Sequence, residues 1–277
     1  MHRALLSANT VVAQPRTVAR ACHLRAACMV DAPPARTVVC AEACSWLAQQ
    51  PSLPCVVTSL PDITELGNEP LCIRDGASYR AWFRATVELI AAKLRPGCVA
   101  VFCQTSTNFQ GELIDKSYLC QQGAADAGAT LLWHKIALRS QDVSLRYGKL
   151  PGFSHLIAFA SPADDVRTLA PQARGFSIPD VFWRGDTVWS RATGVEAALH
   201  ACRFVASLGA TELVDPFCGS GTVLACANHV GLQALGVDLS PKRCRHAGLM
   251  ELKLGPQGEM RARRSSDRGE IEQEPDE

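Results

Sequence analysis

The sequence lacks any apolar run long enough to cross a membrane. A membrane-spanning helix needs about 18 or more consecutive apolar residues, and no stretch of the 277 residues reaches that length. Charge of one sign is also missing, because 28 Lys and Arg residues balance 27 Asp and Glu residues to a net charge of +1. We therefore expect a soluble protein that has no membrane partner and does not bind nucleic acid through bulk charge alone.

Metal-ligand and disulfide patterns are absent as well. The 13 cysteines are scattered along the chain without a single C-x-x-C pair, and the histidines show no i, i+4 spacing. Structural zinc sites and disulfide-rich secreted domains depend on such paired spacing. We interpret the cysteines as small apolar residues of a protein in a reducing compartment, and we assign no metal.

The two ends of the chain differ in charge from its middle. Residues 1–30 carry four arginines and no acid, whereas residues 255–277 carry four arginines and seven acids. We predict a flexible or transit-like N-terminus over 1–34, one folded domain over 35–254 and a disordered charged tail over 255–277. The expected location is intracellular: cytoplasmic, or mitochondrial if the Arg- and Ala-rich start is a transit segment.

Short apolar runs alternate with longer amphipathic stretches after residue 36. Residues 55–59 and 99–102 have the pattern of buried strands, whereas 78–94 and 190–207 place apolar residues at helical spacing. Strands separated by helical crossings predict an α/β fold with a doubly wound parallel sheet covered on both faces. Further strands are expected at 37–40, 130–138, 155–160, 211–214 and 234–237, and further helices at 43–49, 115–127 and 222–229.

The most informative stretch is a glycine-rich turn at 215–222 (DPFCGSGT). It follows a predicted strand and opens a predicted helix, which is where open α/β sheets bind nucleotides. Gly219 and Gly221 remove side chains beside the free N–H groups of the helix. The next strand ends in Asp238, at the place where dinucleotide folds use a carboxylate to bind a ribose diol.

The expected ligand of this turn carries no phosphate. The third glycine of the G-x-G-x-x-G fingerprint is missing. Asp215, just before the turn, would repel a pyrophosphate and attract an ammonium group. A cofactor with a cationic end and a ribose is therefore expected, and S-adenosylmethionine fits both requirements.

The same residues resemble two motifs of the class I S-adenosylmethionine-dependent methyltransferases. The D-P-F-x-G-S-G-T form of motif I is typical of nucleic-acid amino-methyltransferases, namely the DNA N4-cytosine and N6-adenine methylases and the tRNA guanine-N2 enzymes. Residues 236–240 (GVDLS) are similar to the motif whose acid binds the ribose, and 38–43 (VVCAEA) to the third-strand motif, whose acid lies near the adenine. The resemblance implies a Rossmann-like sheet and S-adenosylmethionine as cofactor. It also implies these cofactor-binding residues: Glu42, Asp215, Phe217, Gly219, Gly221, Thr222 and Asp238.

Motif I stands late in the chain, and this order resembles the circularly permuted, beta-type arrangement in which the catalytic motif precedes the cofactor motif. That catalytic motif is [D/N/S]-P-P-[Y/F/W] after the fourth strand, and residues 59–62 (SLPD) stand in its place. Ser59 and Pro61 match this motif, and the resemblance implies that they are catalytic residues, whereas Leu60 replaces a proline and Asp62 replaces the aromatic residue. A carboxylate cannot stack on a base, but it can accept a hydrogen bond or a proton, so we expect Asp62 to be a catalytic acceptor. The alternative is that Asp62 only caps a following helix.

Little of the chain is left for a module that reads base edges in a DNA groove. Four residues could contact phosphate or stack on a splayed base, although a solvated loop explains them equally well: Lys135, Arg139, Arg146 and Tyr147. We therefore expect methylation of a base amino group in RNA, either tRNA or rRNA. Two alternatives stay open: a DNA N4-cytosine or N6-adenine methyltransferase, and a catalytically inactive subunit that binds S-adenosylmethionine beside a protein partner.

Overall fold

The computed structural model describes residues 34–68, 71–142, 151–164, 178–188, 191–255 and 259–264. The chain divides into two units, residues 1–32 and 33–277, and every described residue belongs to the second. No helix within the described ranges is long and apolar enough to cross a membrane. The predicted N-terminal segment, apart from its last residue, lies outside the described residues.

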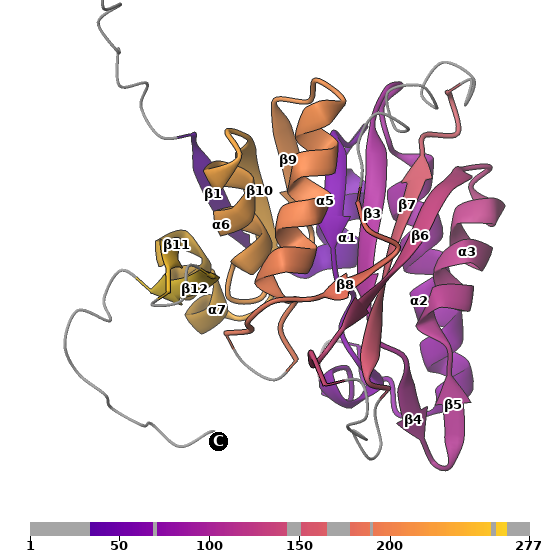
Figure 1. Ribbon diagram of the computed structural model, residues 1–277. Helices are drawn as coiled ribbons and strands as arrows, with labels where there is room; N and C mark the ends of the chain where they lie inside the picture. Colours follow the sequence, from indigo (N-terminus) through magenta and orange to yellow (C-terminus); the bar gives the residue numbers. More distant parts are fainter. Residues whose placement is uncertain are drawn as a thin grey trace, which may run out of the picture. The chain divides into compact units, whose positions relative to one another are not determined.

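An eight-stranded sheet forms the centre of the second unit (Figure 1), in the order β1-β10-β9-β2-β3-β7-β6-β8. Its strands are β1 (Arg36–Cys40), β2 (Cys55–Thr58), β3 (Val99–Gln104), β6 (Thr130–Leu138), β7 (Phe153–Ala160), β8 (Val181–Trp183), β9 (Glu212–Asp215) and β10 (Gln233–Asp238). All neighbours are parallel except β7, which is antiparallel to both β3 and β6. The prediction of a wholly parallel sheet is wrong at β7, because β6 and β7 form a hairpin whose facing ends are Leu138 and Phe153.

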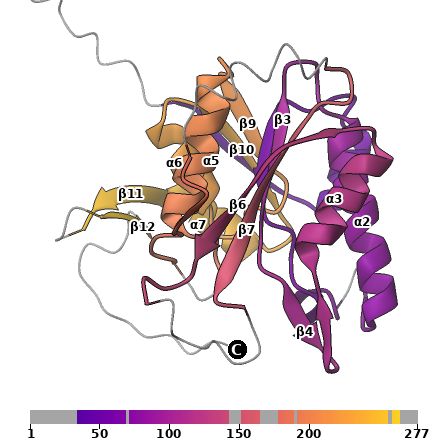
Figure 2. The same ribbon diagram turned by 45° about the vertical axis from the view of Figure 1, so that its right-hand side comes forward.

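Helices cover both faces of this sheet, as Figure 2 shows. Val56 of β2 packs in a cluster with Phe83, whereas the next residue, Val57, packs in a second cluster with Phe204. This alternation buries both faces of β2, and each large apolar side chain removed from water contributes roughly 1.5–3 kcal/mol. The helices of the first cluster are α1 (Ala43–Gln49), α2 (Gly76–Ala92) and α3 (Lys116–Asp126), and those of the second are α5 (Val195–Ser207), α6 (Thr222–His229) and α7 (Pro241–Leu249). Six of the described cysteines are buried, which agrees with their interpretation as apolar residues.

The folded domain extends beyond its predicted end at residue 254. β11 (Met250–Leu254) pairs antiparallel with β12 (Met260–Arg264), so the expected disorder is wrong for 260–264. Met260 and Ala262 pack against the α5 and α6 cluster, while Arg261 forms an ion pair with Asp186. Residues 260–263 alternate between apolar and basic side chains, but this pattern is short and lies in a segment that is otherwise highly charged, so the sequence does not predict the strand. Residues 265–277 lie outside the described residues.

Two small elements follow the central strands. β4 (Thr107–Phe109) and β5 (Glu112–Ile114) form a two-stranded sheet after β3, and the 3-10 helix η1 (Ile63–Glu65) follows β2. Since β1, β10, β9, β2 and β3 are parallel, their carboxyl ends meet at one edge of the sheet. Open α/β sheets bind their ligands at this edge.

Candidate active site

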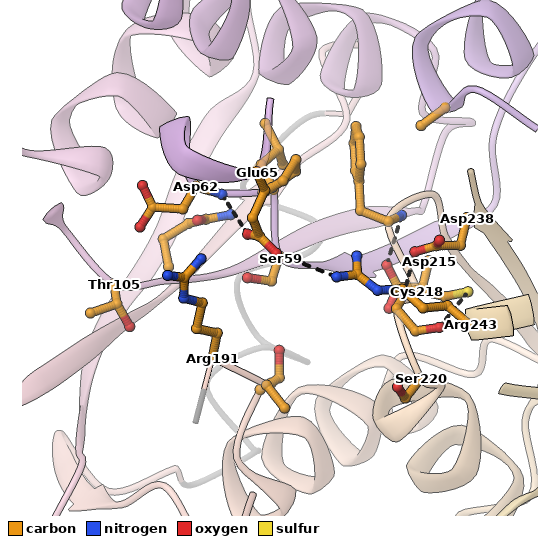
Figure 3. Close-up of a pocket in the computed structure, with 18 of the residues that line it drawn as sticks. Ser59, Asp62, Glu65, Thr105, Arg191, Asp215, Cys218, Ser220, Asp238 and Arg243 are labelled. Atoms are coloured by element: carbon orange, nitrogen blue, oxygen red, sulfur yellow. Dashed lines mark hydrogen bonds and ion pairs between the residues drawn. The ribbon is translucent and has the colours of Figure 1, made fainter. Parts of the chain in front are cut away.

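A pocket of about 600 Å³ lies at the carboxyl edge of the sheet. Figure 3 shows Asp215 and Asp238 on one side of it and Asp62 and Thr105 on the other, with Ser59 between them. Six of the seven predicted cofactor residues line the pocket, and so do all three predicted catalytic residues. The structure therefore brings the glycine-rich turn and the SLPD loop into one cavity, although more than 150 residues separate them in the chain.

Asp215 ends β9 and is only 2% exposed. Its Oδ1 accepts a 2.7 Å hydrogen bond from Thr58 Oγ1 and a 3.1 Å bond from the backbone N of Phe217. Burial raises the pKa of Asp215 to about 7, because the loss of water outweighs these two hydrogen bonds, and the charge of Asp238 adds to the rise. A positively charged ligand beside this carboxyl would favour its ionised form.

Asp238 ends β10 and fixes the glycine-rich turn. Its Oδ2 accepts from the backbone N of Gly219 at 3.1 Å, and its Oδ1 accepts from the backbone N of Ser240 at 2.8 Å. Gly219 has a φ of +53°, and no atom lies within 4 Å of the place where a Cβ would stand. Burial raises the pKa of Asp238 as well. Asp215 and Asp238, whose pKa values are both raised by burial, thus border the same cavity.

Gly221 has a different place from the other predicted cofactor residues. It is absent from the pocket lining, and its φ is +91°. A Cβ at this position would stand 2.6 Å from the Cα of Ala247, which is closer than real atoms approach. The glycine therefore allows the start of α6 to lie directly against α7.

Glu42, the predicted adenine-side acid, lines the pocket and caps α1. Its carboxylate accepts from the backbone N of Cys44 at 2.9 Å and of Ser45 at 2.6 Å. Burial acts to raise the pKa of Glu42, but these hydrogen bonds outweigh it, so that the pKa is lowered. The side chain is thus held ionised in a fixed direction at the end of β1.

Asp62 lies at the N-cap position of η1, and its backbone N donates to Glu65 Oε2 at 2.9 Å. Its Oδ2 is 3.6 Å from Nζ of Lys116, whose side chain is only 4% exposed. Burial lowers the pKa of Lys116, and the charges of Asp62 and Glu65 oppose that effect. Oδ1 of Asp62 is buried without a hydrogen-bond partner among the described residues. The position is that of a cap, but one oxygen is left to accept from a ligand.

Three features of the pocket were not predicted from the sequence. Gln104, at the end of β3, and Lys116, at the start of α3, both line it. Arg184 and Arg191 line it beside the predicted Arg139, and Arg191 donates to Thr64 Oγ1 at 3.0 Å. The position of the polar Gln104 at the end of a buried apolar strand is a signal that could have been used, whereas Lys116 lies 54 positions from Asp62 and has no such signal.

An ion pair crosses the cavity. Arg243 Nη2 of α7 lies 3.7 Å from Glu65 Oε1 of η1, as the dashed line in Figure 3 marks. Of the other predicted substrate residues, Lys135 is not a lining residue and pairs with Asp180 on the surface. Arg146 and Tyr147 lie outside the described residues. Within the described ranges, no group of three or more His, Cys, Asp or Glu side chains is placed to bind a metal ion.

The domain is similar to solved structures of DNA methylases. No family model matches the chain, and no curated protein matches it. TTHA0409, a putative DNA modification methylase from Thermus thermophilus, has a TM-score of 0.58 at 19% identity, over 77% of this chain and 92% of that chain. Its complex with S-adenosyl-L-methionine has a TM-score of 0.56 at 18% identity, over 77% of this chain and 91% of that one. The PvuII DNA methyltransferase (cytosine-N4-specific) has a TM-score of 0.58 at 13% identity, over 78% and 87% of the two chains.

At these identities the similarity shows the fold. The chain has a Rossmann-like α/β sheet similar to the sheets of these methylases, which is the fold that the resemblance at 215–222 and 236–240 implies. The permuted order of the two motifs stays a prediction. Both similar proteins are named as DNA enzymes, so the expected preference for RNA has no support from them.

Proposed function

We propose that this protein is an S-adenosylmethionine-dependent methyltransferase that methylates an amino group of a nucleic-acid base, with DNA favoured over RNA. The observation that carries the proposal is that one pocket at the sheet edge joins both motifs. Two acids with raised pKa values, Asp215 and Asp238, border one half of it. The half-buried carboxylate of Asp62, whose Oδ1 is buried and has no partner among the described residues, borders the other. Its volume lies within the roughly 300–1,000 Å³ of small-molecule sites.

The residues of the first half fit the proposed cofactor. An ammonium group would relieve the buried charge of Asp215, and the carboxylate of Asp238 is fixed by two backbone N–H groups in a direction suited to a ribose diol. Glu42 stands at the end of β1, two strands from β9, where the adenosine part would extend. When bound, the cofactor supplies a methyl group activated by a sulfonium centre.

The residues of the second half suit an amino group. Oδ1 of Asp62 can accept a hydrogen bond from one N–H of the target and take up the proton that the product releases. The buried ammonium group of Lys116 pairs with this carboxylate and so compensates in part for the hydration that the carboxylate loses. Ser59 lies between the two halves and can position the same amino group. Methyl transfer depends mainly on such positioning.

A polymeric substrate is supported by the arginines at the pocket. Arg139, Arg184 and Arg191 all line it, and the planar guanidinium group matches phosphate geometry. A base inside a duplex would have to be rotated out of the helix to reach Asp62. The names of the similar structures favour DNA, and RNA is the second substrate to test.

Two measurements test the proposal. Calorimetry with S-adenosylmethionine should show one site, which Asp238→Ala removes and Asp180→Ala, at an exposed ion pair, leaves unchanged. Tritiated methyl groups should then transfer to DNA, and mass spectrometry of the nucleosides identifies the product. Transfer to RNA alone would reverse the preference, and cofactor binding without transfer would favour the inactive subunit. The absence of cofactor binding would refute the proposal as a whole.

A further inference from the structure

Gln104 is the last residue of β3 and is 1% exposed. Neither Oε1 nor Nε2 of its side chain has a hydrogen-bond partner among the described residues. A buried amide that makes no hydrogen bonds loses its hydration without compensation, and native proteins rarely leave both atoms of such a group unpaired. The amide therefore has the properties of a group that is completed by a ligand.

The surroundings of Gln104 place it on the substrate side of the pocket. Ala100 and Phe102 of the same strand pack against α2 and α3, and alternate residues of a strand share one face. Gln104 follows the same alternation, and it lines the pocket together with Asp62 and Lys116. Lys116 begins α3, one of the helices that cover this face.

The order of the strands separates this side from the proposed cofactor. β2 lies between β3 and β9 in the sheet, and β10 lies beyond β9. Gln104 is therefore two strands from Asp215 and three from Asp238. Along the sheet it has two neighbours: His155 of β7, with which it pairs, and on the other side the end of β2, whose loop carries Ser59 and Asp62.

A primary amide presents one hydrogen-bond donor and one acceptor side by side. The complementary partner is a neighbouring acceptor and donor, such as the ring nitrogen and exocyclic amino group of adenine or cytosine. Asp62, which can only accept when ionised, satisfies an amino hydrogen but offers nothing to the ring nitrogen beside it. The donor that is missing at this position is available from Nε2 of Gln104.

From these observations we propose that Gln104 is a substrate-binding residue whose side-chain amide donates to the ring nitrogen beside the methylated amino group, and so selects the target base. This inference rests on the proposed function and names the residue that binds the base edge at the same site. It makes Asp62 the residue that contacts the reacting amino group and Gln104 the residue that orients the ring.

The first test compares Gln104→Leu with Gln121→Leu. Gln121 lies on α3, is half-buried, and has its own hydrogen bond to the backbone O of Ser117, which makes it a matched control. Gln104→Leu should lower kcat/KM for nucleic acid by about 10- to 100-fold, while the Kd for S-adenosylmethionine stays within about twofold. It should also raise Tm, because an unpaired buried amide is replaced by an apolar group of similar size. A structural amide would give a lower Tm, and that result would contradict the inference.

The second test uses oligonucleotides in which 1-deazaadenine or 3-deazacytosine replaces the methylated base. If Gln104 donates to the ring nitrogen, the wild-type enzyme loses as much activity on the deaza base as Gln104→Leu loses on the natural base, and the two losses do not add. Additive losses would overturn the inference and leave the proposed function intact. A wild-type protein that binds S-adenosylmethionine but methylates no nucleic acid would overturn both.

Discussion

Thr58 Oγ1 donates a 2.7 Å hydrogen bond to Asp215 Oδ1, and this bond joins residues 157 positions apart in the chain. Thr58 ends β2, which leads into the SLPD loop, and Asp215 ends β9, which leads into the glycine-rich turn. Both side chains are buried, and their strands are neighbours in the sheet. The bond therefore fixes the proposed methyl-acceptor side of the pocket relative to the proposed cofactor side.

Asp215→Asn should stabilise the protein in the absence of cofactor. The pKa of Asp215 is about 7 in the folded state and near 3.8 in an unfolded chain. Between these values the folded state holds a proton that the unfolded chain has released, so that stability falls as the pH rises from about 4 to 7. Each tenfold difference in proton affinity corresponds to about 1.4 kcal/mol. The variant should therefore gain up to about 4 kcal/mol above pH 7 and almost nothing at pH 4.

Thermal unfolding of the wild type and Asp215→Asn from pH 4 to pH 8 checks this expectation. Asparagine keeps an oxygen that can accept from Thr58 and from the backbone of Phe217, so the hydrogen bonds are retained. A difference in Tm that stays constant over this range would show that Asp215 does not titrate with a raised pKa.

The affinity for S-adenosylmethionine should increase as the pH rises towards 7, whereas the stability of the protein without cofactor decreases. Binding of its cationic end requires the ionised form of Asp215, whose pKa of about 7 leaves much of it protonated at lower pH. The Kd should therefore rise by at most tenfold for each pH unit below 7, and above 7 it should level off until the α-ammonium group of the cofactor begins to titrate at about pH 8. Calorimetry at pH 5.5 to 8.5 measures this, with Asp215→Asn as the comparison, because the variant should bind weakly and without this dependence. A wild-type Kd that does not change with pH would contradict the assignment.

Asp62→Ala should lower the rate of methyl transfer by about 100-fold or more, because a positioned proton acceptor is lost. The Kd for S-adenosylmethionine should change by only a few-fold, since Asp62 lies on the side of the pocket away from Asp238. Single-turnover kinetics and calorimetry separate the two effects. If Asp62→Ala turns over at the wild-type rate, the residue serves only as the cap of η1, and Ser59 has to position the target.

Arg191→Gln should weaken the binding of nucleic acid without changing the binding of S-adenosylmethionine. Each phosphate contact that is lost reduces the slope of log K against log salt by about one. Fluorescence anisotropy of a labelled oligonucleotide, at salt concentrations between about 50 and 200 mM, measures this slope. Over that range the affinity of a typical site with several phosphate contacts changes by roughly 10³-fold. Arg84→Gln is the control, because Arg84 pairs with Asp126 outside the pocket lining. An unchanged slope would show that Arg191 contacts no phosphate.

Local sequence patterns predict most of the sheet. Apolar runs in the sequence coincide with β2, β3, β6 and β10. Both the glycine-rich turn and Asp238 stand where a strand ends. The direction of β7 is not contained in such patterns, because an apolar run has the same appearance in either direction. β12 was missed because its two apolar residues are surrounded by arginines.

The residues of the candidate site also fall into two groups, those that local sequence predicts and those that it does not. Residues within a motif, such as Asp215 and Ser59, can be predicted, because the motif itself specifies the local backbone. Lys116 meets Asp62 only through the packing of α3 against the sheet, and packing of this kind leaves no mark on either local sequence. The pocket arginines are similar, since Arg191 is brought to Thr64 by the segment that precedes α5.

The position of β1 has a consequence for synthesis of the chain. Its partner is β10, and Arg36 pairs with Ala234 about 200 residues later. At 5–20 residues per second, a ribosome needs about 10–40 s to make the intervening chain. During that time β1 has no strand to pair with, and β2 lacks its neighbour β9. A nascent chain that stops before Gln233 therefore exposes apolar strand edges, and its dependence on chaperones should end only when β10 leaves the exit tunnel.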